Sequence, residues 1–205
     1  MAFFVKRTKG VKVAVGFSLS DAARKWLSTQ ARISIDNGLT NAGKAMPVPE
    51  AVVPLTDSDV AQLSATLGAF VTLNINKRLR GCIGAIVGNA PLYANVWNMA
   101  HAAAFKDPRF PPLKADEWLR CTVDISVLEQ PTLCPNPLAI EVGKHGLILQ
   151  HNGHTGVFLP QVPVEQGWDR AAYLEHLCGK AGLPKGSWEQ PGARLFWYEA
   201  LVFEA

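Results

Sequence analysis

Two stretches with strand-like alternation, separated by a few polar residues, most constrain how this 205-residue chain can fold. FVTLNIN (residues 70–76) alternates apolar and polar side chains, and LRGCIG (residues 79–84) follows it closely. A connection this short joins antiparallel strands. Since a one-residue slip would invert every side chain, matching the two apolar faces fixes the register and requires an odd-numbered loop. A loop of residues 76–78 meets this condition. The predicted pairs are Ile75 with Leu79, Asn74 with Arg80, and Thr72 with Cys82.

This register places the Cys82 thiol on the polar face of the hairpin, with Arg80 two residues before it on the same side. A fixed positive charge favours the thiolate, the reactive form of cysteine. Gly81 and Gly84 would let a substrate approach the backbone, and unpaired N–H groups there could hold an oxyanion. Equally, these small residues could let a helix pack on the strand, with Cys82 as a buried apolar side chain. The sequence leaves both interpretations open.

The rest of the chain mixes helical and strand patterns without a regular strand–helix–strand order. Helical patterns cover residues 18–38, 56–68, 91–105 and 169–184. Strand patterns cover residues 121–130, 138–142, 145–151, 155–160 and 194–205. The NGH segment (residues 152–154) between the third and fourth of these indicates a hairpin. Segments in this order predict an α+β fold with a mixed or antiparallel sheet and packed helices.

The composition is typical of a soluble globular protein, with 48% hydrophobic and 18% charged residues. A length of 205 residues suits one domain, or two small interlocked lobes. The net charge of +3 is too mild to predict nucleic-acid binding, for which a clustered basic face would be expected. Residues 1–16 carry Lys6, Arg7, Lys9 and Lys12, and they predict a solvated N-terminal arm.

The start of the chain has too few consecutive apolar residues for a signal peptide, and no later stretch approaches the length of a membrane-spanning helix. We therefore expect a cytoplasmic protein with reduced cysteines. The four cysteines are Cys82, Cys121, Cys134 and Cys178, and none has a zinc or iron–sulfur spacing. We therefore predict neither a metal site nor a cofactor.

The segments GAFVTLNINKRLRGCIGAIV, AAAFKDPRFPPL, DISVLEQP, VGKHGLILQ, GVFLPQVPVEQGWD and CGKAGL occur in one order along the chain. In sequence and order they resemble the AMMECR-type domain family, whose bacterial and archaeal members are called AmmeMemoRadiSam system protein A. The resemblance covers about residues 17–205, and LRGCIG is a highly specific motif of it.

The resemblance implies a single α+β domain over residues 17–205, with two interlocked lobes and a cleft that contains LRGCIG. It also implies two companions, a Memo-like protein related to extradiol dioxygenases and a radical SAM protein. This chain has no radical SAM cysteine triad, so it would be a companion of that chemistry and not its site. The resemblance implies no particular reaction.

Further polar residues are candidates for the cleft. His101 and His145 titrate near neutrality and could act as acid or base, although either could be structural. Asp107 and Arg109 could pair, Asp107 could form an Asx turn, and the resemblance raises both as cleft residues. Gln161 could hydrogen-bond into the cleft. The predicted cleft set is Thr72, Asn74, Gly81, Gly84, Asp107, Arg109 and Gln161.

Three functions remain open from the sequence. The first is an enzyme or enzyme partner with Cys82 as nucleophile or acceptor, Arg80 stabilising its thiolate, and His145 or His101 moving protons. The second is a non-catalytic binding module that docks a Memo-like or radical SAM partner, or a ligand, with Arg80 binding an anion. The third, nucleic-acid binding through Lys77, Arg78, Arg80 and the basic N-terminal arm, is weaker because aromatic residues are not interleaved with these charges.

Overall fold

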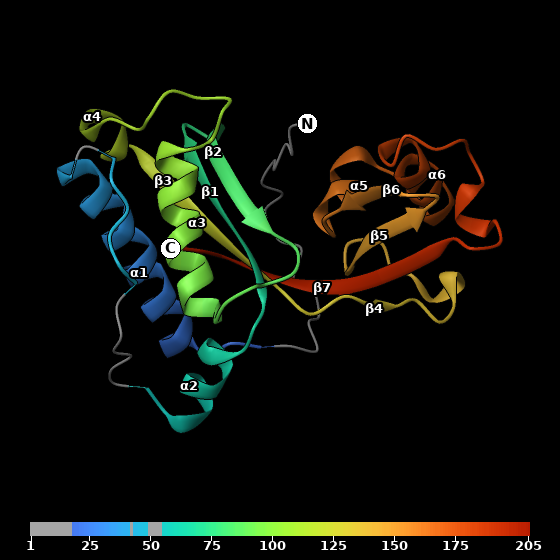
Figure 1. Ribbon diagram of the computed structural model, residues 1–205, viewed down its shortest axis with the longest axis horizontal. Helices are drawn as coiled ribbons and strands as arrows, with labels where there is room; N and C mark the ends of the chain where they lie inside the picture. Colours follow the sequence, from blue (N-terminus) through green and yellow to red (C-terminus); the bar gives the residue numbers. More distant parts are fainter. Residues whose placement is uncertain (1–17, 42, 49–54) are drawn as a thin grey trace. The chain divides into compact units, whose positions relative to one another are not determined.

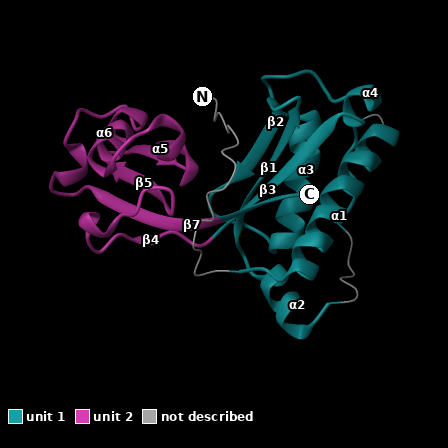
Figure 2. Cartoon of the chain, turned by 180° about the vertical axis from the view of Figure 1, so that it is seen from behind, with its two compact units in different colours: residues 1–4, 18–128, 201–205 teal, residues 5–17, 129–200 magenta. Residues whose placement is uncertain are grey.

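The computed structural model describes residues 18–41, 43–48 and 55–205 (Figure 1). Contacts divide the chain into two compact units, shown in Figure 2. Among the described residues, unit 1 contains the stretch up to Leu128 and the last five residues, and unit 2 contains residues 129–200. The predicted N-terminal arm lies outside the described residues.

Unit 1 contains α1 (Asp21–Thr40), α2 (Asp57–Ser64), α3 (Leu92–Phe105) and α4 (Ala115–Trp118). Side-chain caps explain where the first two helices begin, because hydroxyl oxygens accept N–H groups that have no partner within a helix. Ser20 accepts from the Ala23 N–H at the start of α1, and Thr56 forms a capping box with Asp59 at the start of α2. α2 ends at Ser64, four residues before the end of the predicted helix, because the chain then extends into a strand.

The sheet of unit 1 is built from β1 (Gly68–Ile75), β2 (Arg78–Ala85) and β3 (Cys121–Leu128), which pair antiparallel with β1 between the others. One face is apolar and packs on helices: Val71, Leu73, Val123 and Ile125 are fully buried, α3 packs on β1 and β2, and α1 packs on α3. Figure 1 shows α1 and α3 side by side. The opposite face carries the polar side chains of the same strands.

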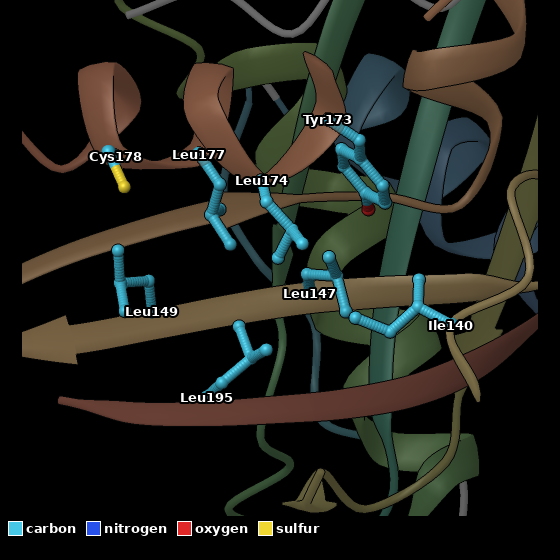
Figure 3. Packing of buried hydrophobic residues seen from close by; sticks show 8 residues of the cluster. All are labelled: Ile140, Leu147, Leu149, Tyr173, Leu174, Leu177, Cys178 and Leu195. Carbon is cyan, nitrogen blue, oxygen red and sulfur yellow. The ribbon is translucent and has the colours of Figure 1, made fainter. Parts of the chain in front are cut away.

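Unit 2 contains β4 (Thr132–Leu133), η1 (Pro137–Ala139), β5 (His145–His151), β6 (His154–Phe158), α5 (Gln161–Gln166), α6 (Arg170–Lys180) and η2 (Ser187–Glu189). Most of β7 (Arg194–Glu204) also belongs to it. α6 packs on β5 and β6. The core between them is shown in Figure 3 and consists of Ile140, Leu147, Leu149, Tyr173, Leu174, Leu177, Cys178 and Leu195.

The α+β class is confirmed, and every strand pair described is antiparallel. The hydrogen-bonded strand order is β2-β1-β3-β7-β5-β6, with β4 beside β7, so β2 is an edge strand among the residues that the structure describes. The strand predicted at residues 138–142 is wrong, because Asn136 caps a short 3-10 helix with Pro137 in its first turn. α5, which contains Pro163, was not predicted. Within the described ranges, no helix is long and apolar enough to cross a membrane.

Candidate functional site

The hairpin that carries Cys82 turns more tightly than predicted. Asn76 and Lys77 both have positive φ, 51° and 63°, and form a two-residue turn that pairs Ile75 with Arg78. This even-numbered loop would bring the wrong faces together, but a register shift opposite Leu73 and Asn74 inserts one extra residue in β2. The shift restores the parity that the sequence requires. The predicted pair of Thr72 with Cys82 is therefore confirmed, and the two pairs nearer the turn are wrong.

The extra residue is Arg80, and the bulge takes it out of the alternation of β2. Its Nε and Nη2 donate to the two carboxylate oxygens of Glu117 at 2.8 and 2.9 Å, and Nη2 also donates to the Pro111 carbonyl. Hydrogen bonding to Arg80 lowers the pKa of Glu117 to about 2. Among the charges that shift the pKa of Cys82, Arg80 does not appear. The predicted pairing of the Arg80 charge with the Cys82 thiolate is therefore corrected.

The backbone of Cys82 is held by an Asp-Pro-Arg turn that follows α3. Asp107 Oδ2 accepts the Cys82 N–H at 2.8 Å, and Arg109 Nη2 donates to the Cys82 carbonyl at 3.1 Å. The two side chains thus give this edge strand the acceptor and the donor that a neighbouring strand would supply. They also pair with each other at 2.7 Å, and the Arg109 N–H donates to Asp107 Oδ1 in an Asx turn. The predicted ion pair and Asx turn are both confirmed.

The thiol itself lies in a buried environment that disfavours the thiolate. Cys82 is 9% exposed, and its Sγ accepts a hydrogen bond from the Thr72 hydroxyl at 3.2 Å. Burial raises the pKa of the Cys82 thiol, an effect that the Thr72 hydrogen bond and the Arg109 charge oppose and the Asp107 charge reinforces. Its N–H is bound by Asp107 and is therefore not available to an oxyanion.

The two glycines of the motif leave room for parts of the chain itself. A Cβ at Gly81 would meet the backbone carbonyl of Ala103 in α3, and a Cβ at Gly84 would meet the ring of Phe70 and the Ala69 carbonyl. Close packing therefore explains why both positions lack a side chain. The contacts support the packing interpretation of these glycines over substrate access.

A row of polar side chains crosses the face of the unit 1 sheet that carries Cys82. Thr72 pairs with both Cys82 and Asp124, and Asn74 pairs with Thr122, so these five side chains share one face and are called the polar row. Asn74 Nδ2 donates to Asp124 Oδ2 at 3.0 Å, whereas Asn74 Oδ1 is buried and has no hydrogen-bond partner. The row runs from the buried Thr72 and Asn74 to the exposed Thr122 at its end.

His101 serves the packing of α3. It is 4% exposed, and its Nε2 lies 3.0 Å from the Gly43 carbonyl. Because a carbonyl only accepts, Nε2 carries the proton of the ring. Burial lowers the pKa of His101, and its ring packs against Phe105. These contacts favour the structural alternative for this histidine.

His145 and Gln161 belong to unit 2, at the start of β5 and of α5, and each unit is described by itself. His145 Nδ1 accepts the Glu141 N–H at 3.0 Å, its ring stacks on Trp197, and Nε2 lies 4.0 Å from Glu199 Oε1. Burial lowers the pKa of His145, and its Nδ1, which accepts an N–H, carries no proton. Their contribution to the predicted cleft stays a prediction.

Two residues that matter to the site were not predicted. Asp124 occupies a polar position of the alternating strand DISV, and that alternation could have placed it on the face of Thr72. Glu117 gives no such signal, because its contact with Arg80 spans 37 residues of sequence. Within the described ranges, no group of three or more His, Cys, Asp or Glu side chains could hold a metal ion.

The fold and the site define a class of α+β protein in which an edge strand presents a buried cysteine held by an Asp-Pro-Arg turn. The chain belongs to the AMMECR1 family, whose model matches residues 29–203. The family resemblance of the sequence is thereby confirmed.

Relatives in archaea match most of the chain. It is 43% identical to Protein MJ0810 of Methanocaldococcus jannaschii over 145 residues, which are 67% of this chain and 72% of that protein. A protein of Thermococcus gammatolerans is 36% identical over 198 residues, 92% of this chain and 93% of its own length. The crystal structure of uncharacterised protein PH0010 from Pyrococcus horikoshii superposes with a TM-score of 0.78 at 36% identity, covering 92% and 94% of the two chains. These relatives show the family and the fold, and their names state no activity.

Proposed function

We propose that this chain is a non-catalytic binding module whose polar row recognises a partner or ligand. In this module Cys82 is a buried structural residue. The environment of Cys82 carries the proposal. A nucleophilic cysteine needs a lowered pKa and access to its substrate. Here burial raises the pKa of the thiol, and the carboxylate of Asp107 lies against the backbone of the same residue.

The other parts of the thiol-enzyme hypothesis find little support in the local contacts. Arg80 is bound to Glu117, and His101 is bound to the Gly43 carbonyl. Arg80 is also 7% exposed, so it is not a surface cation for an anionic partner or a nucleic acid. The polar row, by contrast, has a buried acceptor without a partner and an exposed end, which suit recognition.

The candidate partners are those that the family resemblance implies, a Memo-like protein and a radical SAM protein. The purified proteins from the same organism would be tested for binding by isothermal titration calorimetry. Thr122→Arg changes an exposed side chain of the polar row, so we expect the variant to fold and its affinity for the partner to fall at least tenfold. Since the thiol has no chemical role in this proposal, Cys82→Ser should bind within about twofold of the wild type.

Thr155→Arg is the matched control, because Thr155 is also an exposed threonine on a strand but belongs to unit 2. It should bind like the wild type. Failure of both candidate partners to bind, or equal affinities of the Thr122→Arg and Thr155→Arg proteins, would overturn the proposal. The opposite result would be turnover of either partner's substrate that is lost only in the Cys82→Ser protein. That result would support the hypothesis of an enzyme with Cys82 as nucleophile.

A further inference from the structure

We infer that β6 pairs through its free edge with β6 of a second copy of this chain, which makes the protein a weak symmetric dimer. This interface goes beyond the proposed function, because β6 belongs to unit 2 and the polar row to unit 1. β6 ends the sheet, and β5 is its only strand neighbour among the residues that the structure describes. An edge strand presents main-chain N–H and C=O groups with which a further strand can pair.

The β5–β6 hairpin shows which residues of β6 direct these groups outward. His151 and His154 close a two-residue turn, and the residues that close such a turn hydrogen-bond to each other. Hydrogen-bonded and non-hydrogen-bonded pairs alternate along an antiparallel ladder. The N–H and C=O groups of Thr155 and Val157 therefore point away from β5.

A hydrogen bond on the far side of β5 gives the same result. The Leu195 carbonyl of β7 accepts the Cys134 N–H at 2.8 Å, so the main-chain groups of Leu195 face away from β5. Leu195 pairs with Leu149 of β5, whose own groups must then face β6. Leu149 pairs there with Gly156, which is therefore a residue that bonds to β5. The residues on either side of Gly156 have outward groups.

The free edge of β6 lacks the protection that β2 has at the opposite end of the sheet. At β2, Asp107 and Arg109 occupy the outward groups of Cys82. Within the described ranges, no hydrogen bond occupies the outward groups of Thr155, which is exposed, or of Val157, which is half-buried. The strand HTGVF also contains no lysine, proline or bulge, which are common means of keeping an edge strand from pairing.

The sequence of β6 is complementary to itself when two copies run antiparallel about Gly156. In this register Thr155 of each copy lies opposite Val157 of the other, so two β-branched and uncharged side chains face each other. Each of these two pairs makes two main-chain hydrogen bonds, four in all. A shift of two residues in either direction would place Val157 opposite Gly153 or Thr155 opposite Leu159, both outside the strand.

The occupant is a second copy because the same surface supplies both halves of this match, as a two-fold interface requires. Two strands of five residues form a small contact, well below the roughly 1,000 Å² of a stable interface. We therefore expect a weak dimer, with a Kd on the order of 0.1 mM.

The test measures the full chain by sedimentation equilibrium and by amide hydrogen exchange, over protein concentrations from about 0.02 to 2 mM, which bracket the expected Kd. The average mass should rise from the monomer value towards twice that value. Exchange at the amides of Thr155 and Val157 should slow at least threefold across this range, and exchange at Gly156, which already bonds to β5, should not change. A monomer at every concentration, or a dimer that leaves these two amides unprotected, would overturn the inference.

Variants at the edge test the register. Val157→Pro removes an outward N–H that has no partner in the monomer, so the chain should fold by circular dichroism while the dimer Kd rises at least tenfold. Thr155→Glu is the second variant, should the proline prevent folding. It places two carboxylates diagonally across the two copies and should weaken the dimer to a similar extent.

Gln150→Glu is the matched control for Thr155→Glu. Gln150 is exposed and pairs with Thr155, but it lies on β5, one strand away from the edge. Its dimer Kd should stay within about twofold of the wild-type value. A Thr155→Glu protein that dimerises like the wild type, or equal weakening by Gln150→Glu, would contradict the pairing of β6.

The result is separable from the proposed function. A dimer this weak is scarcely populated at micromolar concentration, so Thr155→Arg remains a valid control in the calorimetric test of partner binding. Absence of the dimer would leave recognition by the polar row untouched. If a Memo-like or radical SAM protein slows exchange at Thr155 and Val157 while the chain alone stays monomeric, the edge pairs with that partner and the assignment to a second copy is wrong.

Discussion

Single residues of the site derive their chemistry from neighbours that are distant in the sequence. Cys82 is held by Asp107 and Arg109, which lie 25 and 27 residues further along the chain, and Arg80 is held by Glu117. The contacts neutralise the charges that the motif would otherwise display. The thiol of the LRGCIG motif is buried, and Arg80 of the motif has a structural role because it is paired with Glu117.

The first prediction at this scale concerns the reactivity of Cys82. Because burial raises the pKa of its thiol, we expect slow alkylation of the folded protein, with an apparent pKa above the unperturbed value of about 8.5. The rate for each cysteine would be measured by mass spectrometry from pH 5 to 10. Cys134, which is half-buried, should react faster, and all four cysteines should react alike in urea. If Cys82 is instead the fastest of the four cysteines to be alkylated, with an apparent thiol pKa below about 8.5, it is not a buried structural residue.

Asp107 carries the second residue-scale prediction. Hydrogen bonding to Arg109 lowers the pKa of Asp107 to about 2, against about 3.9 in an unfolded chain. A lowered folded-state pKa contributes stability above pH 4 that is lost as pH falls towards 2. With a side chain only 2% exposed, the contribution is about 2 kcal/mol at neutral pH. Asp107→Asn should lower the free energy of unfolding by that order.

The measurement is the urea midpoint between pH 2 and 7. Glu117 also has a pKa of about 2 and therefore titrates in the same range. Asp107→Asn should remove only part of the loss of stability at low pH, because the contribution of Glu117 remains. Asp116→Asn, whose side chain is 76% exposed, is the control and should leave the curve unchanged. An acid dependence identical in the Asp107→Asn and wild-type proteins would show that the ion pair contributes nothing.

At the scale of elements, β2 combines a tight turn, a bulge and an edge capped by side chains. The turn requires positive φ at two residues, and the bulge corrects the parity that the turn upsets. The edge is protected at Cys82, where Asp107 and Arg109 replace a neighbouring strand. Gly81 lets α3 approach the other side of the same strand.

The turn gives the element-scale prediction. Lys77 has φ 63°, a conformation that suits glycine better than a residue with a Cβ, and Asn-Gly is the preferred pair for this kind of turn. Lys77→Gly should stabilise unit 1 by about 0.5–1 kcal/mol, seen as a higher urea midpoint. Lys77→Ala should bring no gain, because the strain of the Cβ remains. A lower midpoint for Lys77→Gly would show that the lysine side chain makes a contact that outweighs the strain.

For the whole molecule, the two units share one chain that leaves unit 1 after Leu128 and returns to it at Leu201. The cysteine motif, the Asp-Pro-Arg turn and the polar row all belong to unit 1, whereas His145 and Gln161 belong to unit 2. The proposed recognition of a partner therefore depends on unit 1 alone. The match to the Pyrococcus horikoshii structure, which covers 92% of this chain, shows that the two proteins share this fold.

The sequence by itself determined the longer helices and most of the strands, because periodicity and caps act over a few residues. It fixed α1, α3, α6 and the parity of the β1–β2 pairing. Only the tertiary structure decided the two-residue turn, the bulge at Arg80 and the partners of Cys82 and Arg80. The side chains that hold Cys82 and Arg80 lie 25 to 37 residues away in the sequence, and no local pattern encodes their charges and volumes. The tertiary structure also decided the chemistry of the Cys82 thiol, because burial, and not the spacing of residues in the sequence, raises its pKa.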